Sequence, residues 1–411
     1  MKILALAAAC SALSLPVRAA DVRIWDNGTS AWTDQFTLGD PIDRYSGIAT
    51  DQQRIATDSA DRVYVTWRQS DGTYTRIWLT RYDGTDVRIW DHDGSSWTTT
   101  FSSGDPVDTR KAQAAAEPRL AVDSLDRVYV TFTQSDGTND RIYLTRYNGT
   151  AVQIWDNGTS AWTTTLSSGD PIDFQTAFVT EVSAPAITVD SVDRVYIAWT
   201  QNNKCGLSRY DGTDVRIWDN GGSSWTTTFS SGDSIGTSVL NATLTPVLAD
   251  DSQDRVYVAY REASRNHFSR YDGTDVKIWN KDAGGGWTDT FADGDPIDPM
   301  IFVDGAYEPQ DIAVDSADRV YIAHVAYDNF FYHLYLTRYD GTDVRIWDNG
   351  ASSWTTVFTS GDPIDTNLNN SIDVRNDEID VDSLDRVYVV FLQGASPAYL
   401  SRYDGTDVKI W

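Results

Sequence analysis

Cysteine and long hydrophobic runs are scarce in this sequence of 411 residues. It contains two cysteines, Cys10 and Cys205, which excludes a disulfide framework and a zinc site built from cysteine thiolates. Beyond residue 19 no apolar run reaches the ~18 residues of a membrane-spanning helix, so we expect no membrane insertion. Cys205 is expected to be a buried, unreactive thiol.

Positive charge is also in short supply. The chain has 33 Lys and Arg against 60 Asp and Glu, a formal net charge of −27. Because the acidic residues are spread along the chain, nucleic acid and anionic membrane surfaces are disfavoured as partners. The sixteen tryptophans exclude an unstructured acidic tail. Carbohydrate, protein and cations remain as binding partners.

The familiar catalytic motifs are missing. The sequence has no Gly-x-Ser-x-Gly, no His-Glu-x-x-His, no phosphate-binding glycine loop and no Cys–His pair, which removes the common hydrolase and nucleotide-binding signatures. The many aspartates leave one enzymatic alternative, a polysaccharide hydrolase or lyase with carboxylates at the mouth of a channel.

The first residues are typical of an export signal. Lys2 supplies a positive start, residues 3–15 an apolar stretch, and Val17-Arg18-Ala19 a small-residue cleavage site. We predict a signal peptide over 1–19, a secreted or periplasmic protein, and a single domain over 20–411. A lipid attachment at Cys10 is the alternative interpretation.

Internal repetition dominates the remaining sequence. The segment Asp-Val-Arg/Lys-Ile-Trp, or a close variant, recurs at intervals of 61 to 68 residues. Such a period indicates a repeat architecture and argues against a division into several globular domains. The tryptophans that end the seven copies are Trp25, Trp90, Trp155, Trp218, Trp279, Trp347 and Trp411.

Each repeat unit contains the signals of two β-hairpins. In the second unit, residues 119–123 and 127–132 are short runs of alternating apolar residues joined by a tight turn, as are 142–147 and 150–155. The second pair is joined by Asn148-Gly149, or by Asp-Gly in other units, which favours a type I′ turn. We therefore expect four antiparallel strands per unit.

A third segment follows the fourth strand of each unit. It contains a second tryptophan, a Thr-rich run such as residues 98–101, and in five units the sequence Gly-Asp-Pro-Ile/Val-Asp. The Thr-rich run is interpreted either as a short fifth strand or as an ordered loop. The fourth unit departs from the pattern at Gly232-Asp233-Ser234-Ile235-Gly236.

Small antiparallel sheets with no helical periodicity predict an all-β fold, a six-bladed β-propeller of about 64-residue repeats. The strands at 21–25 and 407–411 are copies of each other, so we expect the N- and C-terminal strands to close the ring. The count leaves one strand over, which we assign to an added outer edge. A seventh blade would need another copy of the first hairpin, and the sequence holds six.

Two families share parts of this pattern. Residues 312–323 and their counterparts resemble the NHL-type repeat of six-bladed propellers, although Asp318 and its equivalents stand where that family usually carries glycine. The segment from Trp90 to Trp97 loosely resembles the Asp-box of bacterial sialidases. These resemblances imply a propeller fold, and no catalytic residue of either family can be matched in this sequence.

The loops divide into uniform and divergent sets. The turns after the first and third strands are nearly identical between units, whereas five other connections differ, and loops of this kind on a rigid scaffold are where recognition usually occurs. The divergent connections are 109–117, 174–184, 237–245, 299–308 and 366–378.

One aromatic loop in the fifth unit is the leading candidate for a ligand site. Aromatic faces beside polar groups suit sugar rings, whereas the alternative is that these rings pack between blades. A metal held by the two histidines and the aspartate is a further alternative. The candidate residues are His324, Tyr327, Asp328, Phe330, Phe331, Tyr332 and His333.

Two further repeated features have competing interpretations. The repeated tryptophans are either wedges between blades or sugar sites, one per blade. The aspartate pairs Asp123 with Asp126 and Asp105 with Asp108 either cap turns or hold Ca²⁺. No cofactor other than Ca²⁺ is indicated by the sequence.

From these observations we predict an exported, monomeric, non-enzymatic binding module. Its ligand is expected to be extracellular or cell-envelope carbohydrate, bound by the divergent loops on one face. The alternatives are the hydrolase or lyase named above and a scaffold for protein–protein interaction.

Overall fold

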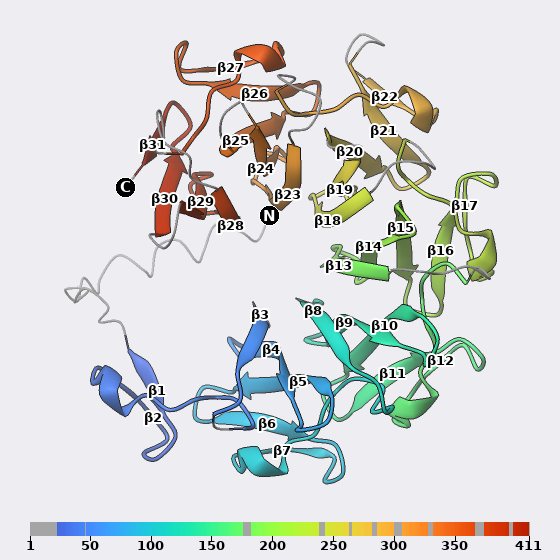
Figure 1. The fold of residues 1–411 in the computed structure, drawn as a ribbon, viewed down its shortest axis with the longest axis vertical. Helices are drawn as coiled ribbons and strands as arrows, with labels where there is room; N and C mark the ends of the chain where they lie inside the picture. Colours follow the sequence, from blue (N-terminus) through green and yellow to red (C-terminus); the bar gives the residue numbers. More distant parts are fainter. Residues whose placement is uncertain are drawn as a thin grey trace, which may run out of the picture.

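The computed structural model describes residues 23–45, 47–175, 182–237, 243–262, 265–281, 286–299, 306–327, 332–365, 374–393 and 398–410. The described residues form small antiparallel sheets arranged radially around a central opening (Figure 1). This confirms the predicted all-β propeller fold. In the same residues, no helix combines the length and hydrophobicity needed to cross a bilayer. The predicted leader at 1–19 lies outside the described residues.

Three sheets, here called blades 1 to 3, follow one another along the first half of the chain. In each, the first strand lies nearest the central opening and the fifth lies outermost (Figure 1). Blade 1 is β3 (Thr50–Thr57), β4 (Val63–Ser70), β5 (Thr75–Tyr82), β6 (Val87–Asp91) and β7 (Ser96–Thr98). Blade 2 is β8 (Ala115–Val122), β9 (Val128–Ser135), β10 (Asp140–Tyr147), β11 (Val152–Asp156) and β12 (Ala161–Thr163). Blade 3 is β13 (Val182–Val189), β14 (Val195–Gln201), β15 (Lys204–Tyr210), β16 (Val215–Asp219) and β17 (Ser224–Thr226).

Blades 4 to 6 continue the ring, and blade 6 has four described strands. Blade 4 is β18 (Thr243–Asp250), β19 (Val256–Glu262), β20 (Arg265–Tyr271), β21 (Val276–Asn280) and β22 (Gly286–Thr288). Blade 5 is β23 (Ala306–Val314), β24 (Val320–Tyr327), β25 (Tyr332–Tyr339), β26 (Val344–Asp348) and β27 (Ser353–Thr355). Blade 6 is β28 (Val374–Val381), β29 (Val387–Gln393), β30 (Ala398–Tyr403) and β31 (Val408–Ile410).

The remaining elements are short. β1 (Ile24–Asp26) and β2 (Ala31–Thr33) form a separate two-stranded sheet. One 3₁₀ turn follows β2 and each of the five fifth strands, so the Thr-rich segment of each unit is divided between the end of a strand and this turn. These turns are Phe36–Leu38, Phe101–Ser103, Leu166–Ser168, Phe229–Ser231, Phe291–Asp293 and Phe358–Ser360.

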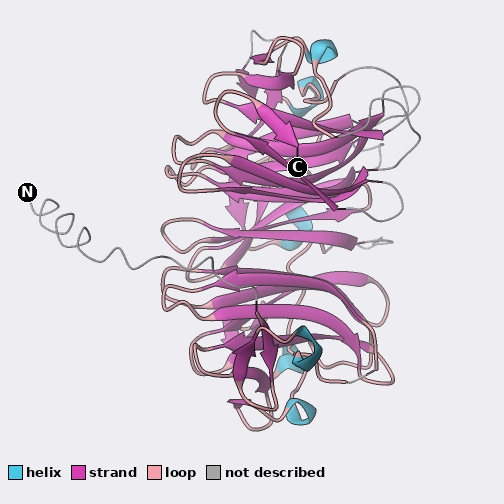
Figure 2. Cartoon of the chain, turned by 90° about the vertical axis from the view of Figure 1, so that its left-hand side faces the viewer, coloured by secondary structure: helices cyan, strands magenta, loops and turns pink. Residues whose placement is uncertain are grey.

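Local hydrogen bonds explain why the hairpins form where the sequence predicts them. In the turn between the third and fourth strands of blade 1, Gly84 has φ +92° and the Asp83 carboxylate accepts from the backbone N–H groups of Thr85 and Asp86, both at 3.1 Å. Glycine adopts this φ without a steric penalty. Turns of this kind reverse the chain at the faces of the ring. The strands run between these two faces, as the edge-on view shows (Figure 2).

The turns between first and second strands also join neighbouring blades. Asp123 accepts from the N–H groups of Leu125 and Arg127, at 3.0 and 2.8 Å, and from the Arg127 guanidinium. Asp126 accepts from the N–H of Ser59 in blade 1 at 2.9 Å. These carboxylates cap turns, and no group of three or more metal-ligating side chains occurs among the described residues. Ca²⁺ binding stays a prediction.

Aromatic side chains fill the outer part of each interface between blades. The rings of Trp90 and Trp97 in blade 1 lie 5.4 and 5.2 Å from that of Tyr147 in blade 2. The guanidinium of Arg81, from the same blade as Trp97, lies 4.7 Å from its ring centre. These tryptophans therefore pack as wedges between neighbouring blades, which is one of the two interpretations given above.

The expected closure of the ring by its terminal strands is not seen among the described residues. There, β1 pairs with β2, and β31 is the outer edge of blade 6. Figure 1 shows an opening between blade 6 and blade 1, with the β1–β2 sheet beside blade 1. The prediction of closure was wrong for the arrangement described, because β1 and β31 are equivalent strands and each already has its place in a different sheet.

Candidate functional site: the central channel

The predicted ligand residue His324 lies in the core of blade 5. Its side chain is fully buried, its Nε2 lies 2.8 Å from Thr337 Oγ1, and its ring stacks on Tyr335. Burial lowers the pKa of His324 to about 3, so the imidazole is neutral at physiological pH.

The position of His324 is an aromatic slot that recurs in every blade. In each blade the slot holds two residues that face each other on the second and third strands. In most blades both of these residues have large rings. The pairs are Trp67 with Trp78, Phe132 with Tyr143, Trp199 with Gly206, Tyr260 with His267, His324 with Tyr335, and Phe391 with Tyr399. The core-packing alternative therefore accounts for His324.

His333 has a structural partner in the segment after blade 5. Its Nδ1 lies 3.0 Å from Asp365, whose carboxylate also accepts from the Leu334 N–H at 2.8 Å. Both side chains are buried. Asp365 is the second aspartate of the Gly-Asp-Pro-Ile-Asp sequence, so this motif caps the start of the third strand.

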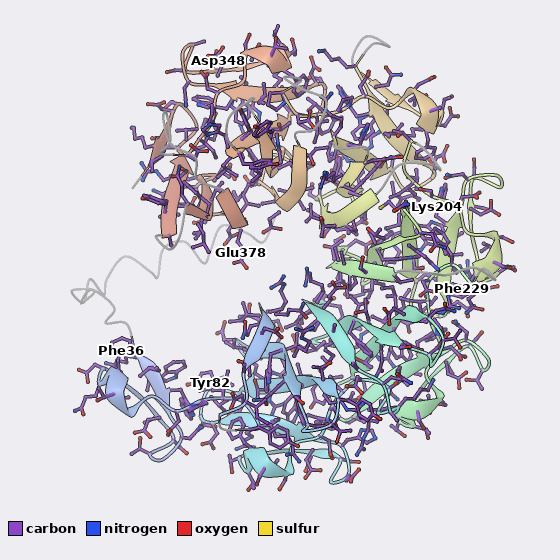
Figure 3. The ribbon with its side chains drawn as sticks, viewed as in Figure 1. Phe36, Tyr82, Lys204, Phe229, Asp348 and Glu378 are labelled. Carbon is purple, nitrogen blue, oxygen red and sulfur yellow. The ribbon has the colours of Figure 1, made fainter. Side chains whose placement is uncertain are left out.

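The same basic–acidic pair recurs in other blades, with arginine in place of histidine. Blades 1, 2 and 4 contain Arg76 with Asp108, Arg141 with Asp173, and Arg265 with Asp298. In blade 3 the equivalent positions are Lys204, labelled in Figure 3, and Gly236, which has no carboxylate. The Thr237 N–H that follows donates to Glu262 at 2.6 Å, as the Phe174 N–H donates to Gln201 at 2.9 Å in the preceding unit.

Two more candidate residues of the aromatic loop, Tyr327 and Tyr332, lie in the described part of blade 5. Tyr327 and Tyr332 face each other across the hairpin with ring centres 5.0 Å apart, and both are half-buried. Asp328, Phe330 and Phe331 lie outside the described residues. The ligand-binding role of this loop stays a prediction.

The central channel offers a second place where the units differ. Each first strand carries a β-bulge, seen as a shift in register such as that between Ala116 and Arg119. A bulge redirects the side chains that follow it. The residues just after the bulges, here called the post-bulge residues, are Arg54, Arg119, Ala186, Val247, Asp311 and Glu378.

The post-bulge residues divide the channel wall by charge. Blades 1 and 2 present arginines, blades 3 and 4 present Ala186 and Val247, and blades 5 and 6 present acids. Figure 3 shows Glu378 on the innermost strand of blade 6, at the central opening. Arg119 interacts electrostatically with Arg54, Asp311 and Glu378, so residues from four blades act on one region.

Burial shifts the ionisation of both signs of charge in this region. It lowers the pKa of Arg119 to about 10, and the like charge of Arg54 adds to the effect. Burial also raises the pKa of Asp311 to about 6, although its carboxylate accepts from the N–H groups of Ile312 and Ile379. A cleft with such perturbed groups is a candidate functional site.

A cavity of about 360 Å³ lies at the end of the channel nearest the first turns. Its wall comes from the ends of the first strands and the following turns of blades 2 to 5. The lining residues are Val122, Asp123, Ser124, Val189, Asp190, Ser191, Asp250, Asp251, Ser252, Val314, Asp315, Ser316 and Asp318.

Asp250 differs from the other carboxylates of this cavity. Asp123, Asp190, Asp251 and Asp315 are each bound by the arginine of their own turn, whereas Asp250 accepts from the Thr188 hydroxyl at 2.5 Å. Burial raises the pKa of Asp250 to about 6. Its counterparts in blades 2, 3 and 5 are valines.

These groups can bind and can exchange protons. Arginines donate hydrogen bonds and carboxylates accept them, so a polyhydroxylated ligand could meet both kinds of partner. Carboxyl groups with a pKa near 6 also change protonation near neutral pH, as general acids and bases do. The sequence holds one trace of this site, because the post-bulge residue differs in charge between units whereas the residue that follows it is Ile or Leu in all six.

Solved structures resemble this chain at low sequence identity. No family model matches the chain, and no curated protein matches it in sequence. A protein of unknown function from Dyadobacter fermentans is similar in structure at 10% identity and a TM-score of 0.45, covering 88% of this chain and 95% of its own. An ulvan lyase of polysaccharide lyase family PL25 has 8% identity and a TM-score of 0.45, with coverage of 87% and 90%. A putative glycosidase from Bacteroides thetaiotaomicron has 9% identity and a TM-score of 0.34, with coverage of 93% and 92%.

Proposed function

We propose that this protein is an exported binding module whose central channel holds a carbohydrate. The observation that carries the proposal is the break in repeat symmetry at the post-bulge residues, where two arginines face two acids. A fold built from repeats needs the same packing residues in every unit, whereas a ligand site needs different ones. The charges at this position therefore serve a purpose other than packing.

The chemistry of the channel wall fits a sugar better than an apolar ligand. The Arg119 guanidinium supplies hydrogen-bond donors, and the carboxylates of Asp311 and Asp250 supply acceptors from other blades around the central channel. Polar groups placed in this way fix the orientation of a hydroxylated ligand. The net charge of −27 disfavours a ligand that is strongly anionic along its whole length.

Binding of purified residues 20–411 to a broad glycan and polysaccharide array, in buffer with calcium, tests this proposal. Arg119→Gln should weaken binding of the selected glycan about 10- to 100-fold, since a hydrogen bond to a charged group contributes about 1.5–3 kcal/mol. Arg345→Gln, on the outer strand β26, is the matched control. An empty array with working controls would contradict the proposal and favour a protein partner.

The raised pKa values of Asp250 and Asp311 favour one second candidate, a polysaccharide hydrolase or lyase. Both carboxyl groups have a pKa of about 6, so at neutral pH each can give up or accept a proton. If Asp311 is a general acid, turnover should fall as the pH rises through 6. Asp311→Asn should then remove turnover while glycan binding persists. Release of reducing ends and formation of unsaturated products distinguish hydrolysis from elimination.

A further inference from the structure

The β1–β2 sheet occupies the place of the outer strands of a blade that precedes blade 1. The ring centres of Trp25 and Trp32 in this sheet lie 5.5 and 5.4 Å from the ring centre of Tyr82 in blade 1. This is the same triad that Trp90 and Trp97 form with Tyr147 at the next interface. β1 and β2 are therefore the fourth and fifth strands of a blade whose first three strands are not among the described residues.

The third strand of that blade would normally supply an arginine. In blades 1 to 5, an arginine of the third strand lies 4.3 to 4.7 Å from the ring of the fifth-strand tryptophan in the same blade. Among the described contacts no cation covers Trp32, which is 44% exposed. Among the described contacts, the guanidinium of Arg402 in blade 6, the counterpart of these arginines, likewise lies over no aromatic ring.

The two inner faces that border the opening are apolar and uncovered. Val390 of blade 6 is 46% exposed, whereas its counterparts in the five preceding blades are fully buried under the next blade. Ile55 of blade 1 is 69% exposed, whereas the equivalent Ile312 and Ile379 are 6% and 7% exposed. A monomer rarely leaves two facing apolar surfaces in water.

The polar links between blades are also unmade at this opening. At the five described interfaces, a turn serine donates its N–H to an aspartate of the next blade, as Ser59 does to Asp126 and Ser316 to Asp385. Ser383 and Asp61 are the corresponding donor and acceptor on the two sides of the opening, and both are exposed.

We infer that the opening is a docking surface for three antiparallel strands that carry one more copy of this repeat. These strands would pair with the free edge of β1 and cover Ile55 and Val390. Their arginine would lie over Trp32, and their turn would accept from Ser383 and donate to Asp61. A preceding fifth strand with its tryptophan would pair with β31 and serve Arg402.

The repeat itself is the partner that the two faces fit. At the five described interfaces, such faces are covered by neighbouring copies of the repeat, through contacts between successive first strands from β3 round to β28. The serine, aspartate, arginine and tryptophan positions beside the opening carry the same residue types as their counterparts at the described interfaces. A ligand of another chemistry would leave the serine, aspartate, arginine and tryptophan positions without their usual partners.

Residues 348–403 of this chain provide the probe, because they run from before a fifth strand to the end of a third strand. The probe is mixed with the full chain and binding is measured by size-exclusion chromatography and titration. Because the isolated probe could fail to fold, a second variant carries the same residues fused after residue 411. Co-elution, or resistance of the fused segment to protease with a raised melting temperature, supports the inference.

Two variants sharpen the result. Trp32→Ala should weaken probe binding about 5- to 30-fold through loss of the cation–π contact, whereas Trp162→Ala, in a blade with all five strands, should leave probe binding unchanged. No binding together with rapid digestion of the fused segment overturns the inference. An intrachain disulfide between Asp61→Cys and Ser383→Cys in the unfused chain also overturns it, since the ring would then close on itself.

Discussion

Asp250 carries an energetic cost that its valine counterparts do not. Its carboxylate is largely removed from water, and the hydrogen bond from the Thr188 hydroxyl offsets part of that cost. The pKa of about 6 lies above the ordinary value of 3.8. A carboxyl group whose pKa is raised on folding stabilises the folded state at low pH, and this contribution is lost as the pH rises through the folded value.

We expect Asp250→Asn to be more stable than the original protein at pH 8, by up to about 2–3 kcal/mol, because the amide keeps an acceptor for Thr188 and carries no charge. Near pH 4 the two proteins should be similar in stability. Denaturant unfolding at pH 4, 6 and 8 measures the difference. A stability difference that does not change with pH would show that Asp250 is ionised without cost.

At the same scale, the two histidines of the candidate loop show what residue types leave open. His324 and His333 were predicted as ligand residues because they lie in an aromatic segment with polar groups nearby. In the structure they serve two repeated packing roles, which tryptophan, phenylalanine or arginine fill in other blades. The sequence lists residue types, whereas these roles depend on which strand faces which neighbour.

Among the elements, the capped third strand shows how a motif acts at a distance. The motif that ends in Asp365 lies 32 residues after His333, yet it supplies the carboxylate that caps the strand beginning there. The Ile364 N–H also donates to the Leu334 carbonyl at 2.8 Å. The motif therefore fastens the connection between blades to the preceding third strand.

Asp365→Ala should lower the free energy of unfolding by about 3–5 kcal/mol, since it leaves His333 and the Leu334 N–H buried without their carboxylate. Asp362→Ala is the matched control. Asp362 belongs to the same motif and accepts from the Gly350 N–H at 3.0 Å, so its loss should cost about 1 kcal/mol. Chemical denaturation of both variants gives the comparison, and equal losses would contradict the capping role.

The elements themselves were predictable because their signals are local. Asp-Gly turns and alternating apolar residues specify the four hairpin strands of each unit. The fifth strand at Ser96–Thr98 was ambiguous, because three residues are too few to show an alternation. The site at the central channel was missed for a different reason. The bulges that precede Arg119 and Asp311 are shifts of register, which appear only when the strands are paired.

For the whole molecule, the open side of the ring should have a dynamic consequence. Blades 2 to 5 are covered on both faces by neighbours, whereas blade 1 presents Val63 and Val65 half-buried where the equivalent Val128 and Val130 of blade 2 are 0% and 2% exposed. A strand with less apolar cover opens locally at a lower free-energy cost.

We therefore expect backbone amides of β4 in blade 1 and β29 in blade 6 to exchange with deuterium faster than those of β14 in blade 3, where both faces are covered. The three strands are the second strands of their blades, so the comparison is between equivalent positions in the fold. Exchange measured by mass spectrometry on the full chain gives the ranking. Addition of the repeat probe should slow exchange in β4 and β29 while leaving β14 unchanged, whereas equal protection of all three strands without the probe would show that no apolar face is open in solution.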